Sequence, residues 1–307
     1  MTRVAAVDCG TNTIKLLVAD LDPTTGTERE LVREMRMVRL GQDVDRTGRL
    51  AAEALARTFA AVDEYAGIVA AHDVEAIRFC ATSAARDAAN GTEFAAGVEA
   101  RLGVRPEVVS GAEEAQLSYD GATRGLVGRH LPAPILVVDI GGGSTELILG
   151  DGHGHVRVGR SLDIGSVRMT ERHLRSDPPT RDEVAAAAAE VSAAIATSGV
   201  PLGDARTVVG VAGTITTMAA GVLGLDGYDR AAIDQAELAV GDVHALTERL
   251  LGMTVAERRA LPYMHPGRAD VIGAGALILD EVLRRTTVDT LLVSEADILD
   301  GIAWSVA

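Results

Sequence analysis

The pattern of apolar and polar residues predicts the same series of elements twice along the chain. Each half begins with a short apolar strand, a turn of small polar residues and two further strands. Helices then alternate with single buried strands, so that each half has the order β-β-β-α-β-α. Alanine-rich stretches with helical apolar spacing, mostly bounded by Gly or Pro, predict the helices. They cover residues 51–71, 92–102, 112–126, 181–197 and 269–285.

An internal duplication accounts for the repeated order. Residues 4–18, VAAVDCGTNTIKLLV, align without a gap with residues 135–149, ILVVDIGGGSTELIL. A match at the same offset pairs CATSA (80–84) with VAGTI (211–215). A third match, VVSGAE (108–113) with LVSEAD (292–297), has a larger offset, so the second half carries an insertion before that point.

The duplication divides the chain into two domains. The 307 residues, 47% of them hydrophobic, are enough for two buried cores. A glycine and two prolines in residues 128–134 place the boundary between residues 1–128 and 129–307. The last helix is expected to pack back on the N-terminal domain. Two related α/β domains imply a cleft between them, to which both present strand ends and helix N-termini.

Charge and hydropathy narrow the range of functions. The formal net charge of −15 argues against a nucleic-acid-binding surface, which requires a concentrated basic face. No apolar stretch is long and charge-free enough to span a bilayer, and the N-terminus lacks a signal-peptide pattern. We therefore expect a cytoplasmic protein that binds neither nucleic acid nor membrane.

The two matched turns predict phosphate-binding loops. In DCGTNTIK (8–15) the aspartate ends a buried strand, and the small residues leave backbone N–H groups free to face an anion. Asn12 and Thr13 add side-chain donors there. In DIGGGSTE (139–146), Gly142 and Gly143 let the backbone approach a phosphate closely, while Ser144 and Thr145 add hydroxyls. For either turn alone, an ordinary tight hairpin is the alternative interpretation.

The duplicated positions also differ in charge. Lys15, the only lysine of the chain, is equivalent to Glu146. A phosphate hydrolase needs a cation to neutralise charge, carboxylates to hold Mg²⁺ and a base to orient water. The cation can be Lys15, and the carboxylates can be Asp139 and Glu146. A further acid is needed as the base.

That further acid is predicted at the helix start SGAEEAQLSY (110–119). Glu113 and Glu114 follow a buried strand and a serine cap there. Acidic residues are common in the first turn of a helix, so ordinary helix-start acids are the alternative. The sequence does not separate the two glutamates.

Two more stretches offer anion contacts. Arg86 follows a strand and a turn of small residues, which would let its guanidinium bind phosphate oxygens, although an ion pair with Asp87 is the alternative. In VAGTITT (211–217) a strand runs through Gly213 and Thr214 into a helix, the arrangement of an anion site at a helix N-terminus.

These stretches resemble the motifs of the exopolyphosphatase and guanosine pentaphosphate phosphatase (Ppx/GppA) family. The residues that carry the resemblance are DCGTNTIKLL, ATSAARDA, SGAEEA, DIGGGSTE and VAGT, with RADVIGAGALIL and VSEADILDGIA near the end. The resemblance spans essentially the whole chain. It implies an α/β fold of two duplicated actin-like domains with an interdomain cleft.

The resemblance also implies roles for individual residues. It makes Glu114 the base and assigns Asp139, Glu146 and Asp8 to a Mg²⁺ or Mn²⁺ site. It further implies that Arg86 and Lys15 contact phosphate and that the protein forms a homodimer. The remaining substrate-binding residues are Asn12, Thr13, Gly142, Gly143, Ser144, Thr145, Gly213 and Thr214.

The expected activity is release of orthophosphate from the ends of inorganic polyphosphate. The chain ends soon after the second domain, without the C-terminal helical domains of longer members, so short polyphosphate is favoured. Guanosine pentaphosphate 5'-phosphohydrolase is the nearest alternative. An ATP-dependent kinase of the same fold and a non-catalytic sensor of polyphosphate or alarmone are the others.

Overall fold

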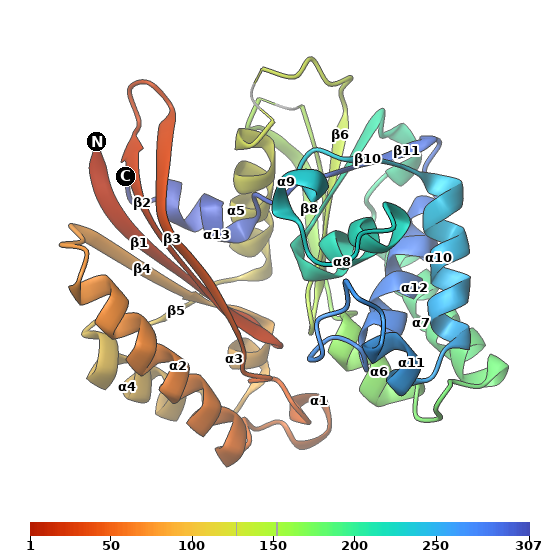
Figure 1. The fold of residues 1–307 in the computed structure, drawn as a ribbon, viewed down its shortest axis with the longest axis horizontal. Coiled ribbons are helices and arrows are strands. Elements are labelled where there is room, and N and C mark those ends of the chain that lie inside the picture. Colours follow the sequence, from red (N-terminus) through yellow and green to blue (C-terminus); the bar gives the residue numbers. More distant parts are fainter. Residues whose placement is uncertain (127, 152) are drawn as a thin grey trace. The chain divides into compact units, whose positions relative to one another are not determined.

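A computed structural model describes residues 1–126, 128–151 and 153–307. The chain forms two compact units, each with its own sheet (Figure 1). Unit 1 consists of Met1–Gly121 and Ile298–Ala307, and unit 2 of Ala122–Asp297.

Unit 1 is built on a five-stranded sheet of order β3-β2-β1-β4-β5. Its strands are β1 (Thr2–Cys9), β2 (Thr13–Asp22), β3 (Thr27–Met37), β4 (Ala76–Ala81) and β5 (Glu107–Val108). The first three pair antiparallel, and β4 runs parallel to both β1 and β5. Its helices are α1 (Val44–Thr47), α2 (Ala52–Ala70), α3 (Ser83–Asp87), α4 (Gly91–Leu102), α13 (Ile298–Trp304) and most of α5 (Gly111–Arg124).

Unit 2 has a six-stranded sheet of order β10-β11-β9-β6-β7-β8. Its strands are β6 (Ile135–Ile140), β7 (Thr145–Gly150), β8 (Val156–Leu162), β9 (Thr207–Val211), β10 (Glu237–Ala239) and β11 (Thr290–Val293). Its helices are α6 (Ser166–His173), α7 (Arg181–Thr197), the short η1 (Leu202–Asp204), α8 (Ala212–Val222), α9 (Arg230–Ile233), α10 (Val240–Gly252), α11 (Val255–Arg259) and α12 (Ile272–Leu283).

The two sheets confirm the predicted duplication and α/β class. Strand order β8-β7-β6-β9-β11 in unit 2 repeats β3-β2-β1-β4-β5 in unit 1, with the same parallel and antiparallel neighbours. The chain therefore has two α/β units that share one core strand order, as the duplication predicts. The predicted insertion is also present: α9, β10, α10 and α11 lie between α8 and α12, and β10 adds an edge strand.

The division between the units differs from the predicted boundary after Gly128. It falls within α5, between Gly121 and Ala122. The glycine and prolines of 128–134 mark a loop, but packing changes earlier in the chain. A Cβ on Gly125 would lie 3.1 Å from Cβ of Ala296, so the residues just after α5 already pack on unit 2.

Helix α13 is part of unit 1 although it ends the chain. Leu299 and Ile302 are fully buried in one apolar cluster with residues of β1 and β2. The guanidinium of Arg33 on β3 forms an ion pair with Asp300, and Trp304 Nε1 donates to Glu28 Oε2 at 3.0 Å. Burial of the apolar face and these polar contacts together hold the helix on this sheet.

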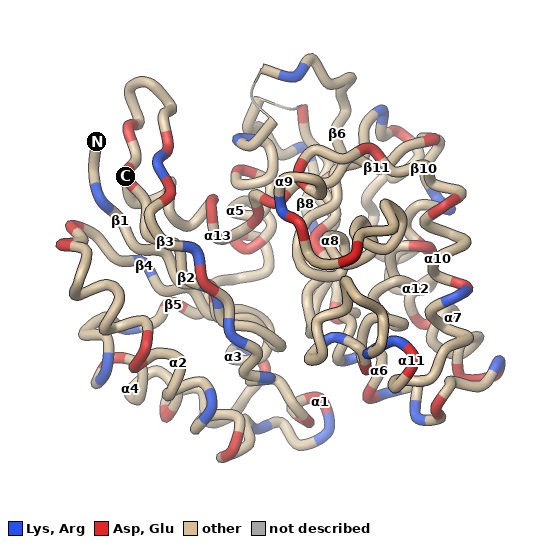
Figure 2. The backbone as a smooth tube through the Cα atoms, viewed as in Figure 1, with Lys and Arg blue, Asp and Glu red and all other residues tan. Residues whose placement is uncertain are grey.

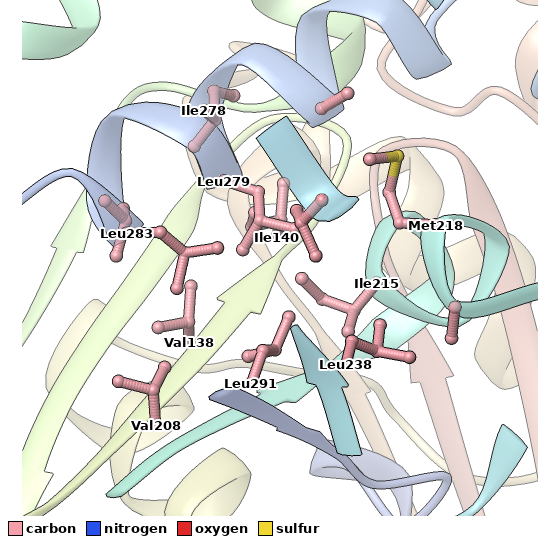
Figure 3. Close-up of a cluster of buried hydrophobic side chains, with 14 of the residues drawn as sticks. Val138, Ile140, Val208, Ile215, Met218, Leu238, Ile278, Leu279, Leu283 and Leu291 are labelled. Atoms are coloured by element: carbon pink, nitrogen blue, oxygen red, sulfur yellow. The ribbon is translucent and has the colours of Figure 1, made fainter. Parts of the chain in front are cut away.

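Unit 2 has the larger core. Figure 3 shows Val138 and Ile140 of β6 facing Ile278, Leu279 and other residues of α12.

Charged residues of both signs are distributed over both units (Figure 2). No helix of the described residues is long and apolar enough to cross a membrane.

Candidate functional site

The candidate residues of unit 2 lie where β6 and β9 end. The two strands are parallel, with Asp139 opposite Val211, so the loops that follow them emerge at the same edge of the sheet. The loop 141–144 joins β6 to β7, and β9 leads directly into α8. A Cβ on Gly275 of α12 would lie 2.8 Å from Thr214 Oγ1 and 3.3 Å from Cβ of Ser166, so the beginnings of α6 and α8 both approach this glycine.

The first turn of α6 holds the carbonyl groups of the glycine loop. The N–H of Ser166 donates to Gly141 O at 3.0 Å, and those of Val167 and Arg168 donate to Gly142 O at 2.8 and 3.1 Å. Arg168 Nε donates to Gly143 O at 2.8 Å. Three successive carbonyl groups are therefore fixed toward α6.

Fixed carbonyls also fix the direction of the N–H groups. In a trans peptide the C=O of one residue and the N–H of the next point in opposite directions. The N–H groups of Gly142, Gly143 and Ser144 therefore point away from α6, and no hydrogen bond among the described residues takes them. Successive N–H groups directed to one side form a concave anion site.

The equivalent loop of unit 1 is held in a similar way. Gly41 N donates to Thr11 O at 2.9 Å, and Val38 N and Arg39 N donate to Asn12 O at 3.1 and 2.9 Å. The N–H groups of Asn12 and Thr13 are directed away from these contacts for the same reason. Asn12 Oδ1 is buried and accepts no hydrogen bond from any residue that the structure describes, which leaves it available to a ligand, water or cation.

The duplicated charges are direct cross-strand neighbours. Asp8 of β1 lies opposite Lys15 of β2, with 3.7 Å between Oδ2 and Nζ. In unit 2, Asp139 of β6 lies opposite Glu146 of β7. Both unit 2 carboxylates are nearly buried, at 6% and 2% exposure, and Ser161 Oγ of β8 donates to Glu146 Oε1 at 2.6 Å. The unit 1 hairpin thus places a carboxylate beside an ammonium group, whereas the unit 2 hairpin places two carboxylates opposite each other.

The structure separates the two glutamates at the start of α5. Ser110 Oγ caps the helix by accepting from Glu113 N. The Glu113 side chain is 45% exposed and pairs with Arg78 on the sheet surface. The Glu114 side chain is only 7% exposed, and its Oε2 accepts from Arg86 Nη1 at 3.0 Å. The same Arg86 nitrogen donates to Val109 O, which fixes the guanidinium between β5 and α5.

Arg268, a partly buried residue of the segment before α12, contacts the start of α8. Arg268 Nη1 donates to Gly213 O and Thr217 Oγ1, both at 3.1 Å. A Cβ on Gly213 would lie 2.3 Å from Arg268 Nη2, so a side chain at this position would displace the guanidinium from its present place. Burial lowers the pKa of Arg268, although Tyr228, Glu295 and Asp297 oppose this effect. Ala212, just before, has φ of +69°, a backbone conformation that costs energy for alanine and is frequent at functional sites.

Oxygen ligands of the kind that Mg²⁺ and Mn²⁺ prefer are present. Asp139 and Glu146 offer adjacent carboxylates in unit 2, and a Mg²⁺ ion is commonly bound by one or two carboxylates, substrate oxygens and water. Among the described residues, no group of three or more His, Cys, Asp or Glu side chains is arranged to hold a metal. The predicted ligand Asp8 is paired with Lys15, so it is the least favoured of the three.

Thr145, which the sequence predicts to bind substrate, makes a contact within unit 2. Its side chain is fully buried, and Oγ1 donates to Ile164 O at 2.6 Å. The hydroxyl therefore ties β7 to the segment before α6.

Sequence reasoning missed Ser161, Arg168 and Arg268. Ser161 could have been found, because an antiparallel register that places β8 beside β7 brings it opposite Glu146. The two arginines contact loop carbonyls from distant positions in the chain, and no local pattern marks such contacts.

We expect Gly165→Ala to destabilise unit 2. A Cβ at this position would lie 2.4 Å from Gly142 O and 2.5 Å from Gly142 C. These are backbone atoms, so relieving the clash would require the glycine loop itself to move. Overpacking of this kind lowers the free energy of unfolding by about 1–3 kcal/mol, which urea denaturation measures. Gly241→Ala in α10 is the control, since no atom lies within 4 Å of its added Cβ. Equal stability of the two variants would contradict the close contact.

Two duplicated α/β units, each with N–H groups directed out of a fixed loop, are suited to binding phosphoryl groups. The chain matches the Ppx/GppA phosphatase family over residues 21–306 and belongs to that family.

Relatives of the chain support this membership. Exopolyphosphatase 2 of Mycobacterium tuberculosis is 49% identical over 320 aligned positions, which cover 100% of this chain and 99% of the relative. The crystal structure of an exopolyphosphatase-like protein is 47% identical, with a TM-score of 0.96 over 100% of this chain and 98% of its own. The PPX-GPPA enzyme of Aquifex aeolicus is 31% identical, with a TM-score of 0.83 and 99% coverage of both chains.

Proposed function

We propose that this protein is a metal-dependent exopolyphosphatase that releases orthophosphate from the ends of short inorganic polyphosphate. Full-length similarity to exopolyphosphatase 2 of Mycobacterium tuberculosis supports the substrate class. The observation that carries the choice of water as acceptor is the buried Glu114 carboxylate, held by Arg86 at 3.0 Å. The predicted homodimer and cytoplasmic location belong to this proposal.

Glu114 acts as the general base in this proposal. It takes a proton from a water molecule, whose oxygen attacks the terminal phosphorus. The bond between that phosphorus and the bridging oxygen breaks, giving orthophosphate and a chain shorter by one phosphate. Arg86 Nη1 holds the Glu114 carboxylate at 3.0 Å, which fixes the position of the oxygens that would accept the proton.

The other residues bind and orient the phosphates. The N–H groups of Gly142, Gly143 and Ser144 in unit 2 are suited to receive phosphate oxygens, and those of Asn12 and Thr13 offer a separate set of donors in unit 1. Asp139 and Glu146 would hold Mg²⁺ or Mn²⁺, and the bound ion would neutralise charge on the phosphate oxygens. Lys15 adds positive charge beside the unit 1 loop, and Gly213 and Thr214 form a further anion contact at the start of α8.

Orthophosphate release from substrates that differ beyond the scissile phosphate tests the proposal. We expect release from tripolyphosphate and short polyphosphate in the presence of Mg²⁺, with loss of activity when the metal is chelated. Preferred release from guanosine pentaphosphate would make the protein an alarmone phosphohydrolase. Transfer of phosphate from ATP to an acceptor would indicate a kinase, and tight binding of polyphosphate without any release would indicate a sensor.

A further inference from the structure

We propose that Arg168 is a positioning residue that sets the direction of one phosphate-binding N–H group. The proposal rests on the proposed function, since it concerns the glycine loop as the phosphate site. Arg168 lies in the first turn of α6, and its Nε donates to Gly143 O at 2.8 Å. The C=O of Gly143 and the N–H of Ser144 belong to one peptide group, so the contact at one end orients the other.

The comparison between the duplicated loops shows why this side chain matters. Two carbonyl groups of the unit 1 loop, those of Thr11 and Asn12, accept from backbone N–H groups. In unit 2, backbone N–H groups hold Gly141 and Gly142, whereas the donor to Gly143 is the Arg168 side chain. A single side-chain substitution can therefore release this peptide group and leave the rest of the loop fixed.

The guanidinium could act in another way, through its positive charge beside bound phosphate. Three substitutions distinguish the two roles because of where each side chain carries its donor. Arg168→Gln places an amide nitrogen at the position of Nε and removes the charge. Arg168→Lys keeps the charge but places a methylene at that position, and Arg168→Met removes both donor and charge.

A positioning role and a purely electrostatic role of Arg168 predict opposite rankings of the variants by kcat. If Arg168 positions the peptide group, Arg168→Gln retains kcat within about threefold of wild type, whereas Arg168→Lys and Arg168→Met lose on the order of tenfold to a hundredfold. If only the charge matters, Arg168→Lys is the active variant and Arg168→Gln is not. The second ranking would overturn the proposal.

Arg172→Met is the matched control on the same helix. Arg172 lies one turn after Arg168, where it forms an ion pair with Glu190 of α7. Arg172→Met removes one positive charge from α6, as Arg168→Met does. It should leave kcat for tripolyphosphate unchanged. An equal loss of kcat in Arg172→Met and Arg168→Met would show a general effect on α6 and refute the positioning role. Melting temperatures of all variants identify any that fail to fold.

Measurements of binding and of turnover together distinguish failure of the proposed exopolyphosphatase function from failure of the positioning role of Arg168. Calorimetry with inorganic tripolyphosphate in the absence of metal measures the anion site without chemistry. If wild type binds tripolyphosphate but releases no orthophosphate, the proposed function fails, and the affinities of the Gln and Lys variants still decide the role of Arg168. If wild type turns over and all Arg168 variants equal it in both assays, the positioning role alone fails. A wild-type protein that neither binds nor hydrolyses tripolyphosphate overturns both.

Discussion

Glu114→Gln is expected to lower kcat for orthophosphate release from tripolyphosphate by on the order of 10²–10⁴-fold, the contribution of a general base. The amide cannot accept a proton from water, yet it keeps the shape of the side chain. KM should change little, because Glu114 is assigned no contact that binds the phosphate chain in the ground state. Steady-state kinetics at saturating Mg²⁺ measures both values.

Glu113→Gln is the control for this prediction. The two residues are neighbours in the first turn of α5, but the carboxylate of Glu113 pairs with Arg78 and is half exposed. Its substitution removes the same charge from the same helix end, so general effects on the helix dipole are matched. We expect it to retain near wild-type activity. Loss of activity in Glu113→Gln with retention in Glu114→Gln would reverse the assignment of the base.

These two glutamates show where sequence reasoning stops. The sequence predicted the serine cap and the acidic first turn, because each depends on local chemistry. The strand before them is present as β5, but both of its residues are exposed, not buried as predicted. Successive residues of a helix point about 100° apart, so one carboxylate faces Arg86 and the other Arg78. Which one faces inward depends on the rotation of α5 against the sheet, and distant residues set that rotation.

The duplicated strands were easier to predict. A gapless match of two strand-turn-strand segments predicts the same register in both hairpins, and the structure agrees: Asp8 lies opposite Lys15, and Asp139 lies opposite Glu146. The contacts of Arg168 and Arg268 with loop carbonyls do not follow from it. Those side chains come from α6 and from the segment before α12, and only the folded packing brings them to Gly143 and Gly213.

The division of the chain by packing differs from the predicted boundary for a related reason. Glycine and proline mark where the backbone turns, which is a local property. The division within α5 reflects which residues share contacts, including those of α13 from the other end of the chain. No local sequence pattern at Gly121 indicates that the residues before it pack on unit 1 and those after it on unit 2.

Glu146→Gln should abolish metal-dependent turnover while leaving the fold intact. Loss of one carboxylate ligand removes several kcal/mol of charge stabilisation, which corresponds to a decrease of kcat/KM on the order of 10²–10³-fold. Since Glu146 is 2% exposed and accepts from Ser161, the amide retains the volume and can still accept that hydrogen bond through its oxygen. Mn²⁺ binding, followed by the relaxation of water protons, should weaken in parallel with turnover.

Two further variants decide whether the effect belongs to the carboxylate pair. Ser161→Ala removes only the donor to Glu146 Oε1 and should weaken Mn²⁺ binding by about tenfold, the effect of losing a partner that orients a ligand. Glu190→Gln removes a carboxylate that pairs with Arg172 and should leave Mn²⁺ binding unchanged. If Glu146→Gln binds Mn²⁺ as tightly as wild type, the metal is not held by this pair. The function of the opposed carboxylates would then have to be sought in direct contact with water or phosphate.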